Sequence, residues 1–322
     1  MIAPIMGRAV FAAEPVLLSA RDTLAPPPAT VESERRVLQE LTWKPTEFPV
    51  TLQEVEGEEY QAVLRFPSPL ETGDPVNDRV AVLWYRSTKP QGEGGRSAVV
   101  VVHESGSAMP VGKMFARGFA ARGVDAFLVQ LPYYGLRKTN QQQLTERKVL
   151  VAIRQGIADV RRTRDAVAAV PDIHPQKISL QGTSLGGFVS ATVAGLDGAF
   201  HRVFIMVAGG DLYSLLEHGQ RESAELKRRL DEAGYTGEKL KEVLEKVEPN
   251  RLAHRIDPRR TWLYSANQDQ VVPIANALSF KQAARLPDDH HIRLWGDHVT
   301  TIVYFPVIAD HVVQQILQPP EQ

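Results

Sequence analysis

The sequence contains no cysteine among its 322 residues. Disulfide bonds, thiolate metal ligands and a cysteine nucleophile are therefore excluded, whereas the cellular compartment stays open. An apolar run near the roughly 18 residues that a membrane-spanning helix needs is also missing. Residues 1–15 are mildly apolar, but Pro4, Arg8 and Glu14 interrupt them, which is a poor match to a signal peptide. We therefore expect a cytoplasmic protein without a transmembrane segment.

An excess of charge of either sign is missing as well. Lysine and arginine total 37 against 38 aspartate and glutamate residues, which gives a formal net charge of −1. Neither nucleic acid nor an anionic membrane surface is therefore indicated as a partner. The chain is 43% hydrophobic and 23% charged, as expected for a soluble globular protein with a large core.

Apolar runs alternate with helical patterns along most of the chain. We interpret residues 1–45 as an N-terminal arm with a short helix over 31–41, and residues 46–322 as one domain. The expected strands are residues 48–52, 60–66, 79–85, 97–103, 124–131, 177–180, 201–208, 261–266 and 291–295. The main expected helices are residues 111–122, 145–170, 274–286 and 299–317, with a further one from Leu185 onward.

This order of elements predicts a fold. Strands that are apolar on both faces and alternate with helices form a mostly parallel central sheet with helices on both faces. Turn-rich residues 47–90 predict antiparallel strands before it. Residues 211–257 break the alternation with polar, charged helical patterns, which predict a helical lid insert.

One short segment predicts chemistry. Gly182-Thr183-Ser184-Leu185-Gly186 connects a predicted strand to a predicted helix and matches the G-x-S-x-G nucleophile elbow. Glycines are needed there because the turn is so tight that side chains would collide with the neighbouring strand or helix. The alternative is a glycine-rich turn without chemistry, so the partners of Ser184 decide between the two interpretations.

A serine hydroxyl needs a histidine base, and the histidine needs a carboxylate that fixes its tautomer. Asp269 directly follows the strand over 261–266, and His298 follows the strand over 291–295, so the order is Ser, Asp, His. Asp269 as a turn residue and Asp211 as the acid remain alternatives. Asp297 is interpreted as a loop aspartate.

The tetrahedral oxyanion requires two backbone N–H donors. We expect one at Leu185 and the other in the loop after the strand over 97–103, with Ser105 first and Glu104 second. The Glu104 carboxylate either forms a hydrogen bond near Ser184 or belongs to a loop salt bridge. Tyr133 and Tyr134 are candidates to line the pocket, with packing as the alternative.

From Val99 to its end the chain resembles the α/β-hydrolase superfamily. The segments 156–162 and 178–187 are similar to the dienelactone-hydrolase-like and acetyl-xylan-esterase-like branches, and dienelactone hydrolases also have a glutamate at the Glu104 position. Their nucleophile is cysteine, so their lactone chemistry does not extend to a chain with Ser184. The resemblance implies the α/β-hydrolase fold and a serine esterase that acts on small-molecule carboxylic esters.

The resemblance leaves other functions open. No metal and no organic cofactor is needed for the expected chemistry. A peptidase or amidase of the same fold is one alternative, although such peptidases usually have a large N-terminal β-domain. A non-catalytic member that uses the pocket for ligand binding is the other, because the loop at residues 103–106 reads His-Glu-Ser-Gly rather than His-Gly-Gly.

Overall fold

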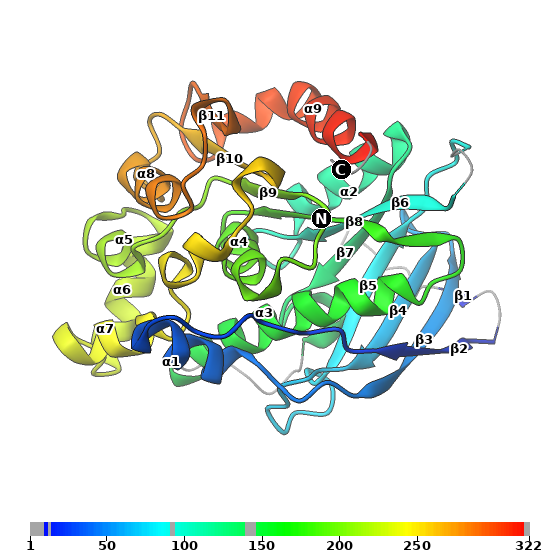
Figure 1. Cartoon of the computed structure of the whole chain (residues 1–322), viewed down its shortest axis with the longest axis horizontal. Helices are drawn as coiled ribbons and strands as arrows, with labels where there is room; N and C mark the ends of the chain where they lie inside the picture. Colours follow the sequence, from blue (N-terminus) through cyan, green and yellow to red (C-terminus); the bar gives the residue numbers. More distant parts are fainter. Residues whose placement is uncertain (1–9, 12–13, 91–93, 139–145, 319–322) are drawn as a thin grey trace, which may run out of the picture.

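A single twisted sheet with helices on both faces forms the protein (Figure 1). The structure is a computed structural model, and it describes residues 10–11, 14–90, 94–138 and 146–318. In these residues eleven strands are ordered β1-β3-β4-β5-β7-β6-β8-β9-β10-β11, and β2 pairs with β3. The strands are β1 Val10–Phe11, β2 Val16–Arg21, β3 Glu47–Glu56, β4 Ala62–Pro67, β5 Arg79–Tyr85, β6 Arg96–Val102, β7 Asp125–Gln130, β8 Ile173–Thr183, β9 Val203–Met206, β10 Thr261–Ala266 and β11 His291–Leu294.

The sheet divides into an antiparallel and a parallel part. Strands β1 to β5 pair antiparallel, as does β5 with β7. From β7 through β6, β8, β9 and β10 to β11 every pairing is parallel. The predicted fold class, an α/β-hydrolase fold with antiparallel N-terminal strands, is confirmed.

Helices cover the two faces of the sheet. The α-helices are α1 Glu32–Leu41, α2 Pro110–Arg122, α3 Glu146–Ala168, α4 Leu185–Asp197, α5 Leu212–His218, α6 Glu222–Glu232, α7 Gly237–Glu245, α8 Ile274–Ala283 and α9 Phe305–Leu317. Successive side chains of a strand point to opposite faces of the sheet, so β6 contributes residues to two separate hydrophobic cores, one on each face. Val100 and Val102 pack with residues of α3, α4 and α8, whereas Val99 and Val101 pack with residues of α2 and α9. In the described part of the chain, no helix is both long and apolar enough to span a bilayer.

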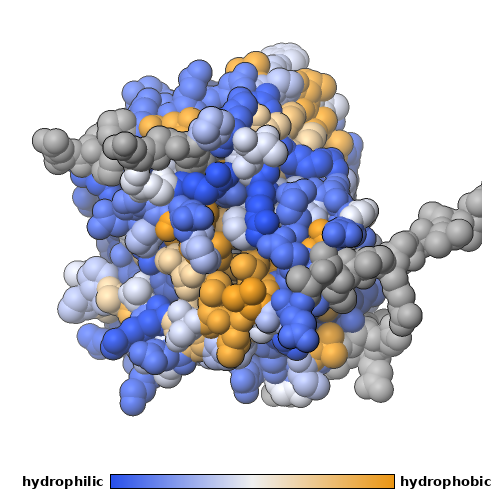
Figure 2. Space-filling model, turned by 90° about the vertical axis from the view of Figure 1, so that its right-hand side faces the viewer, coloured by the Kyte–Doolittle hydropathy of each residue, from blue (hydrophilic) through white to orange (hydrophobic). Residues whose placement is uncertain are grey.

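Described residues of the N-terminal segment join the sheet and its core, where Ala20 and Leu24 are buried. Strand β2 pairs antiparallel with β3 over six residues. Figure 2 looks onto the side of the molecule that carries β1 and β2, where apolar patches interrupt a mostly hydrophilic surface. Val16 and Leu17 of β2 are 54% and 72% exposed. The predicted helix of this segment is present as α1.

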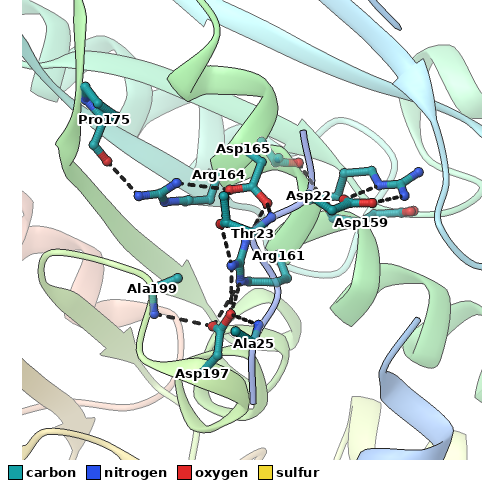
Figure 3. A network of polar contacts seen from close by, with 12 residues as sticks. Asp22, Thr23, Ala25, Asp159, Arg161, Arg164, Asp165, Pro175, Asp197 and Ala199 are labelled. Atoms are coloured by element: carbon teal, nitrogen blue, oxygen red, sulfur yellow. Dashed lines mark hydrogen bonds and ion pairs between the residues drawn. The ribbon is translucent and has the colours of Figure 1, made fainter. Parts of the chain in front are cut away.

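Buried ion pairs connect this segment to α3 (Figure 3). The fully buried guanidinium of Arg161 contacts the carboxylates of Asp165 and Asp197 at 2.9 and 2.7 Å. The N–H and hydroxyl of Thr23 donate to the same Asp165 carboxylate at 2.8 and 2.7 Å. Asp22 pairs with the next arginine of the helix, Arg162, at 2.5 Å.

The charged residues of the segment 156–162 are therefore structural. Besides the two arginines, Asp159 pairs with the fully buried Arg137 at 2.8 Å. Arg137 also donates to the carbonyl oxygens of Asn77 and Gln130, which fixes the loop after β7. This part of the family resemblance reflects the fold rather than the site.

The residues of the predicted insert form three α-helices, α5, α6 and α7, and then two short 3-10 helices, Pro249–Arg251 and Ala253–Arg255. The three α-helices have a small apolar core of their own, made by Leu216, Leu230, Leu240 and Leu244. The α5–α6 turn contacts the loop after β10, where the N–H of Gln220 donates to the Gln270 carbonyl at 2.7 Å. The Ser223 hydroxyl donates to the Val271 carbonyl at 2.8 Å.

Candidate active site

Ser184 lies at the turn between β8 and α4, at the carboxyl end of the parallel strands. Its backbone has φ 52° and ψ −116°, a region that non-glycine residues rarely adopt. A Cβ atom at Gly182 would lie 2.1 Å from the Gly186 carbonyl oxygen, and one at Gly186 would lie 2.2 Å from the Val102 carbonyl oxygen. Both positions therefore exclude any side chain, which is the physical reason for the G-x-S-x-G spacing.

A continuous chain of hydrogen bonds joins Ser184 to the two predicted partners. His298 Nε2 lies 2.9 Å from Ser184 Oγ, although the two residues are 114 positions apart. His298 Nδ1 lies 2.6 Å from Asp269 Oδ2. Since the carboxylate only accepts, Nδ1 carries the proton and Nε2 is left to accept from the hydroxyl.

The Asp269 carboxylate is itself fixed in place. Its Oδ1 accepts from the backbone N–H groups of Val271 and Val272 at 2.9 and 2.8 Å. The side chain is almost fully buried within the loop that follows β10. Asp269 therefore forms a turn, as the alternative interpretation proposed, and contacts the imidazole with its second oxygen.

The rival carboxylates have other partners. Asp211 is the N-cap of α5, where its Oδ1 accepts from the Ser214 N–H at 3.1 Å. Asp297 Oδ1 accepts from the N–H groups of Val299 and Thr300, as expected for a loop aspartate. The structure brings Asp269, and neither of these two, to His298.

The candidate oxyanion donors lie at the start of α4 and in the loop after β6. Leu185 opens α4, so its N–H belongs to the first turn, which has no intrahelical acceptor. Ser105 and Ser184 line the same cavity. Glu104 forms neither predicted contact: its carboxylate accepts from the N–H groups of Val111 and Gly112, both at 2.9 Å. It therefore caps the N-terminus of α2 while still bordering the cavity.

His103 holds this loop in position, a role that the sequence analysis did not assign. Its Nδ1 donates to the Glu104 carbonyl at 2.6 Å, and its Nε2 accepts from the Leu131 N–H at 3.1 Å. Burial lowers the pKa of His103 to about 4, so the ring is neutral and can keep one donor and one acceptor nitrogen. The only sequence signal was its place at the end of the strand.

The two tyrosines after β7 do not line the cavity beside Ser184. Tyr134 packs edge-on against the His103 ring, with the ring centroids 4.7 Å apart. The Tyr133 N–H donates to Asn77 Oδ1 at 3.0 Å, from a residue with φ 68°. Packing, the alternative interpretation, describes Tyr134, whereas Tyr133 is fixed through its backbone.

Two hollows meet at His298. The first has a volume of about 260 Å³, contains Ser184 and is largely apolar, with walls that include Phe115, Tyr264, Ile302 and Ile308. The second has a volume of about 510 Å³ and polar walls. It is lined by Arg221, Gln268, Asp269, Gln270, Val271, Asp297 and His298. Among the residues that the structure describes, Val271 and His298 alone line both.

The apolar walls could not be read from the sequence, because they come from elements that the fold alone brings together. Phe115 lies on α2, Tyr264 on β10, Ile308 on α9 and Ile302 on the short 3-10 helix Thr300–Tyr304. Glu222, at the start of α6, reaches the same cavity from the insert. Among the described residues, no three carboxylate or imidazole groups are arranged to bind a metal ion.

Several solved structures with the same fold are enzymes. An acetyl xylan esterase from Paenibacillus sp. R4 has a TM-score of 0.66 at 15% identity, covering 90% of this chain and 96% of that one. Acetyl xylan esterase 1 from Thermoanaerobacterium sp. JW/SL YS485 has a TM-score of 0.63 at 16% identity, with 89% and 93% coverage. A puromycin-hydrolyzing peptidase from Mycobacterium tuberculosis has a TM-score of 0.56 at 15% identity, covering 85% of this chain and 47% of that one.

Comparisons by sequence found neither a matching family model nor a matching curated protein. Identities of 15–16% show the fold alone, and the fold is that of the α/β hydrolases.

Proposed function

We propose that the protein is a serine hydrolase of the carboxylesterase type, with Ser184 as nucleophile, His298 as base and Asp269 as acid. His298 Nε2 takes the hydroxyl proton as Ser184 Oγ attacks the carbonyl carbon of an ester. The N–H groups of Leu185 and Ser105 donate to the carbonyl oxygen as it becomes negative. Asp269 orients the imidazole and stabilises its cationic form.

The cycle closes with the same groups. His298 gives the proton to the oxygen of the leaving alcohol, and the acyl group remains on Ser184. A water molecule then loses its proton to His298 and attacks the acyl carbon, which releases the acid and restores the hydroxyl. Every proton is exchanged between substrate, water, Ser184 and His298.

The hydrogen-bond chain Ser184–His298–Asp269, at 2.9 and 2.6 Å, carries this proposal. A merely structural serine does not need a strained backbone, whereas a nucleophile that must project above a strand-to-helix turn does. The cavity beside Ser184 provides room for a substrate.

A fluorophosphonate probe, which phosphonylates activated serines, tests the assignment. We expect the wild type to be labelled and to hydrolyse p-nitrophenyl butyrate, and the Ser184→Ala variant to do neither. Ser105→Ala is the matched control, because it keeps the backbone N–H and should still be labelled. Labelling of Ser184→Ala would contradict the proposal.

Amide hydrolysis is the second candidate, because solved structures with this fold include peptidases. The chain covers less than half of those two proteins. The p-nitroanilide of butyric acid, compared with the p-nitrophenyl ester, separates the two activities. We expect kcat/KM to be higher for the ester, and the opposite order would favour an amidase.

A further inference from the structure

We infer that the substrate is an ester of a medium-length apolar acid with a polar, hydroxylated alcohol. The inference rests on the proposed function, since it assigns the two hollows at His298 to the two halves of an ester. The acyl group lies in the apolar cavity with Ser184, and the alcohol lies in the polar hollow with Arg221.

The positions of the reacting atoms determine which hollow binds the acyl half of the ester and which binds the alcohol half. The acyl carbon becomes bonded to Ser184, and Ser184 lines only the apolar cavity. The leaving oxygen must lie at His298 Nε2, which protonates it, and His298 borders both hollows. The alcohol therefore extends from His298 toward the polar hollow.

The apolar cavity has more volume than an acetyl group fills. About 260 Å³ holds eight or nine groups of the size of a water molecule, taking roughly 30 Å³ for each. Its deep walls include Phe115, Tyr264 and Ile308, all buried, and the Tyr264 hydroxyl already has a partner in His311 Nδ1 at 2.7 Å. The interior therefore suits an alkyl chain of about six to eight carbons, and shorter chains leave much of it unfilled.

The polar hollow presents donors and acceptors together. Arg221 donates, Asp297 accepts, and the amides of Gln268 and Gln270 can do both. Carboxylates balance the cation, so the surroundings fit a neutral alcohol with several hydroxyl groups better than an anion.

Arg221 is held at this place by the insert. It has φ 53° and ψ −117°, and it lies between Gln220 and Ser223, whose hydrogen bonds fasten the turn to the loop of Asp269. We assign Arg221 as a residue that determines specificity for the alcohol.

The acyl half is tested with p-nitrophenyl acetate, butyrate, octanoate and palmitate. Six methylenes separate acetate from octanoate, and burial of only three, at about fourfold each, raises kcat/KM roughly 60-fold. We expect at least that ratio of octanoate to acetate, with no further rise for palmitate. Val111→Trp and Ile302→Trp, which narrow the cavity, should each reduce the ratio at least tenfold.

Val307→Trp is the matched control for the acyl half. Val307 lies on α9, is 70% exposed and does not line the cavity. Its substitution should leave the octanoate-to-acetate ratio unchanged. Ile302 is already 38% exposed, so a larger side chain there is compatible with folding even if Val111→Trp is not.

The alcohol half is tested with 1-octanoyl glycerol and ethyl octanoate, which share the acyl chain. We expect the wild type to prefer the glycerol ester at least tenfold in kcat/KM, and Arg221→Gln to remove most of that preference. Arg228→Gln is the control, because Arg228 lies on α6, the helix that directly follows Arg221, is exposed and pairs with Glu225 and Glu232 away from the hollow. It should keep the preference.

The outcomes separate this inference from the proposed function. Hydrolysis that depends on Ser184 but is fastest for acetate, or is indifferent to chain length, overturns the inference and leaves the esterase proposal standing. Equal rates for glycerol and ethyl esters overturn the assignment of the polar hollow. Absence of any hydrolysis that depends on Ser184 overturns both proposals.

Discussion

Replacing Asp269 by asparagine tests the proposed mechanism at its most specific point. The two side chains have nearly the same shape, and the amide oxygen of asparagine can keep accepting from the N–H groups of Val271 and Val272. That orientation directs the amide NH₂ at His298 Nδ1, which then has to accept. The proton moves to Nε2, and the imidazole can no longer accept from Ser184.

We expect Asp269→Asn to reduce kcat strongly and to leave substrate binding and stability nearly unchanged. An inverted histidine tautomer in a triad costs about 10⁴-fold in kcat, or about 5.5 kcal/mol of transition-state stabilisation. Substrate contacts in the cavity are unchanged, so KM for p-nitrophenyl butyrate should move less than about threefold. The thermal midpoint should stay within a few degrees of the wild type, because the two backbone hydrogen bonds remain.

Steady-state kinetics with purified Asp269→Asn and Asp211→Asn make the comparison. Asp211 caps α5 and should be dispensable for turnover. If Asp269→Asn retained more than a tenth of the wild-type kcat, or if Asp211→Asn lost as much as Asp269→Asn, the assignment of the acid would be wrong.

Three further predictions concern stability. Gly186→Ala should prevent folding or cost several kcal/mol, because its Cβ would lie 2.2 Å from a backbone oxygen; circular dichroism and the thermal midpoint measure this. Arg161→Met should lower the free energy of unfolding by about 3–5 kcal/mol in chemical denaturation, since the buried Asp197 would lose its cation and Asp165 would keep only Arg164. The lowered pKa of His103, about 4, means that the unfolded chain binds a proton that the folded one does not. The contribution of His103 to stability should therefore be full above about pH 6.5 and fall by up to about 3 kcal/mol as pH falls to about 4, and His103→Gln should remove this contribution while those of His201 and His291 remain.

The positions of the three proposed catalytic residues could be predicted because parallel strands end at one edge of a sheet. Ser184, Asp269 and His298 each follow a strand whose apolar pattern was clear, so their meeting required only the order of strands. The G-x-S-x-G glycines added a local constraint that backbone sterics alone explain.

Other features depend on contacts between distant segments, and no local pattern carries them. Strand β2 is short, with Val16 and Leu17 exposed, so its apolar pattern did not distinguish a strand from an arm. Glu104 was expected near Ser184 or in a salt bridge, but the start of α2 offers it two N–H donors. The cavity walls come from helices and strands far apart in the sequence, whose side chains converge only after folding.

The fastening of the α5–α6 turn to the loop of Asp269 has a consequence for how such an enzyme can change. Gln270 and Val271 bond to the turn through their carbonyls, while the N–H of Val271 holds the Asp269 carboxylate. Replacing the insert by a different segment would therefore disturb the orientation of Asp269, the proposed acid, along with the surface that we propose binds the alcohol. A change of substrate preference through this insert, by evolution or by engineering, therefore has to preserve the two hydrogen bonds of Gln220 and Ser223. Without these bonds, a gain in selectivity would be accompanied by a loss of turnover.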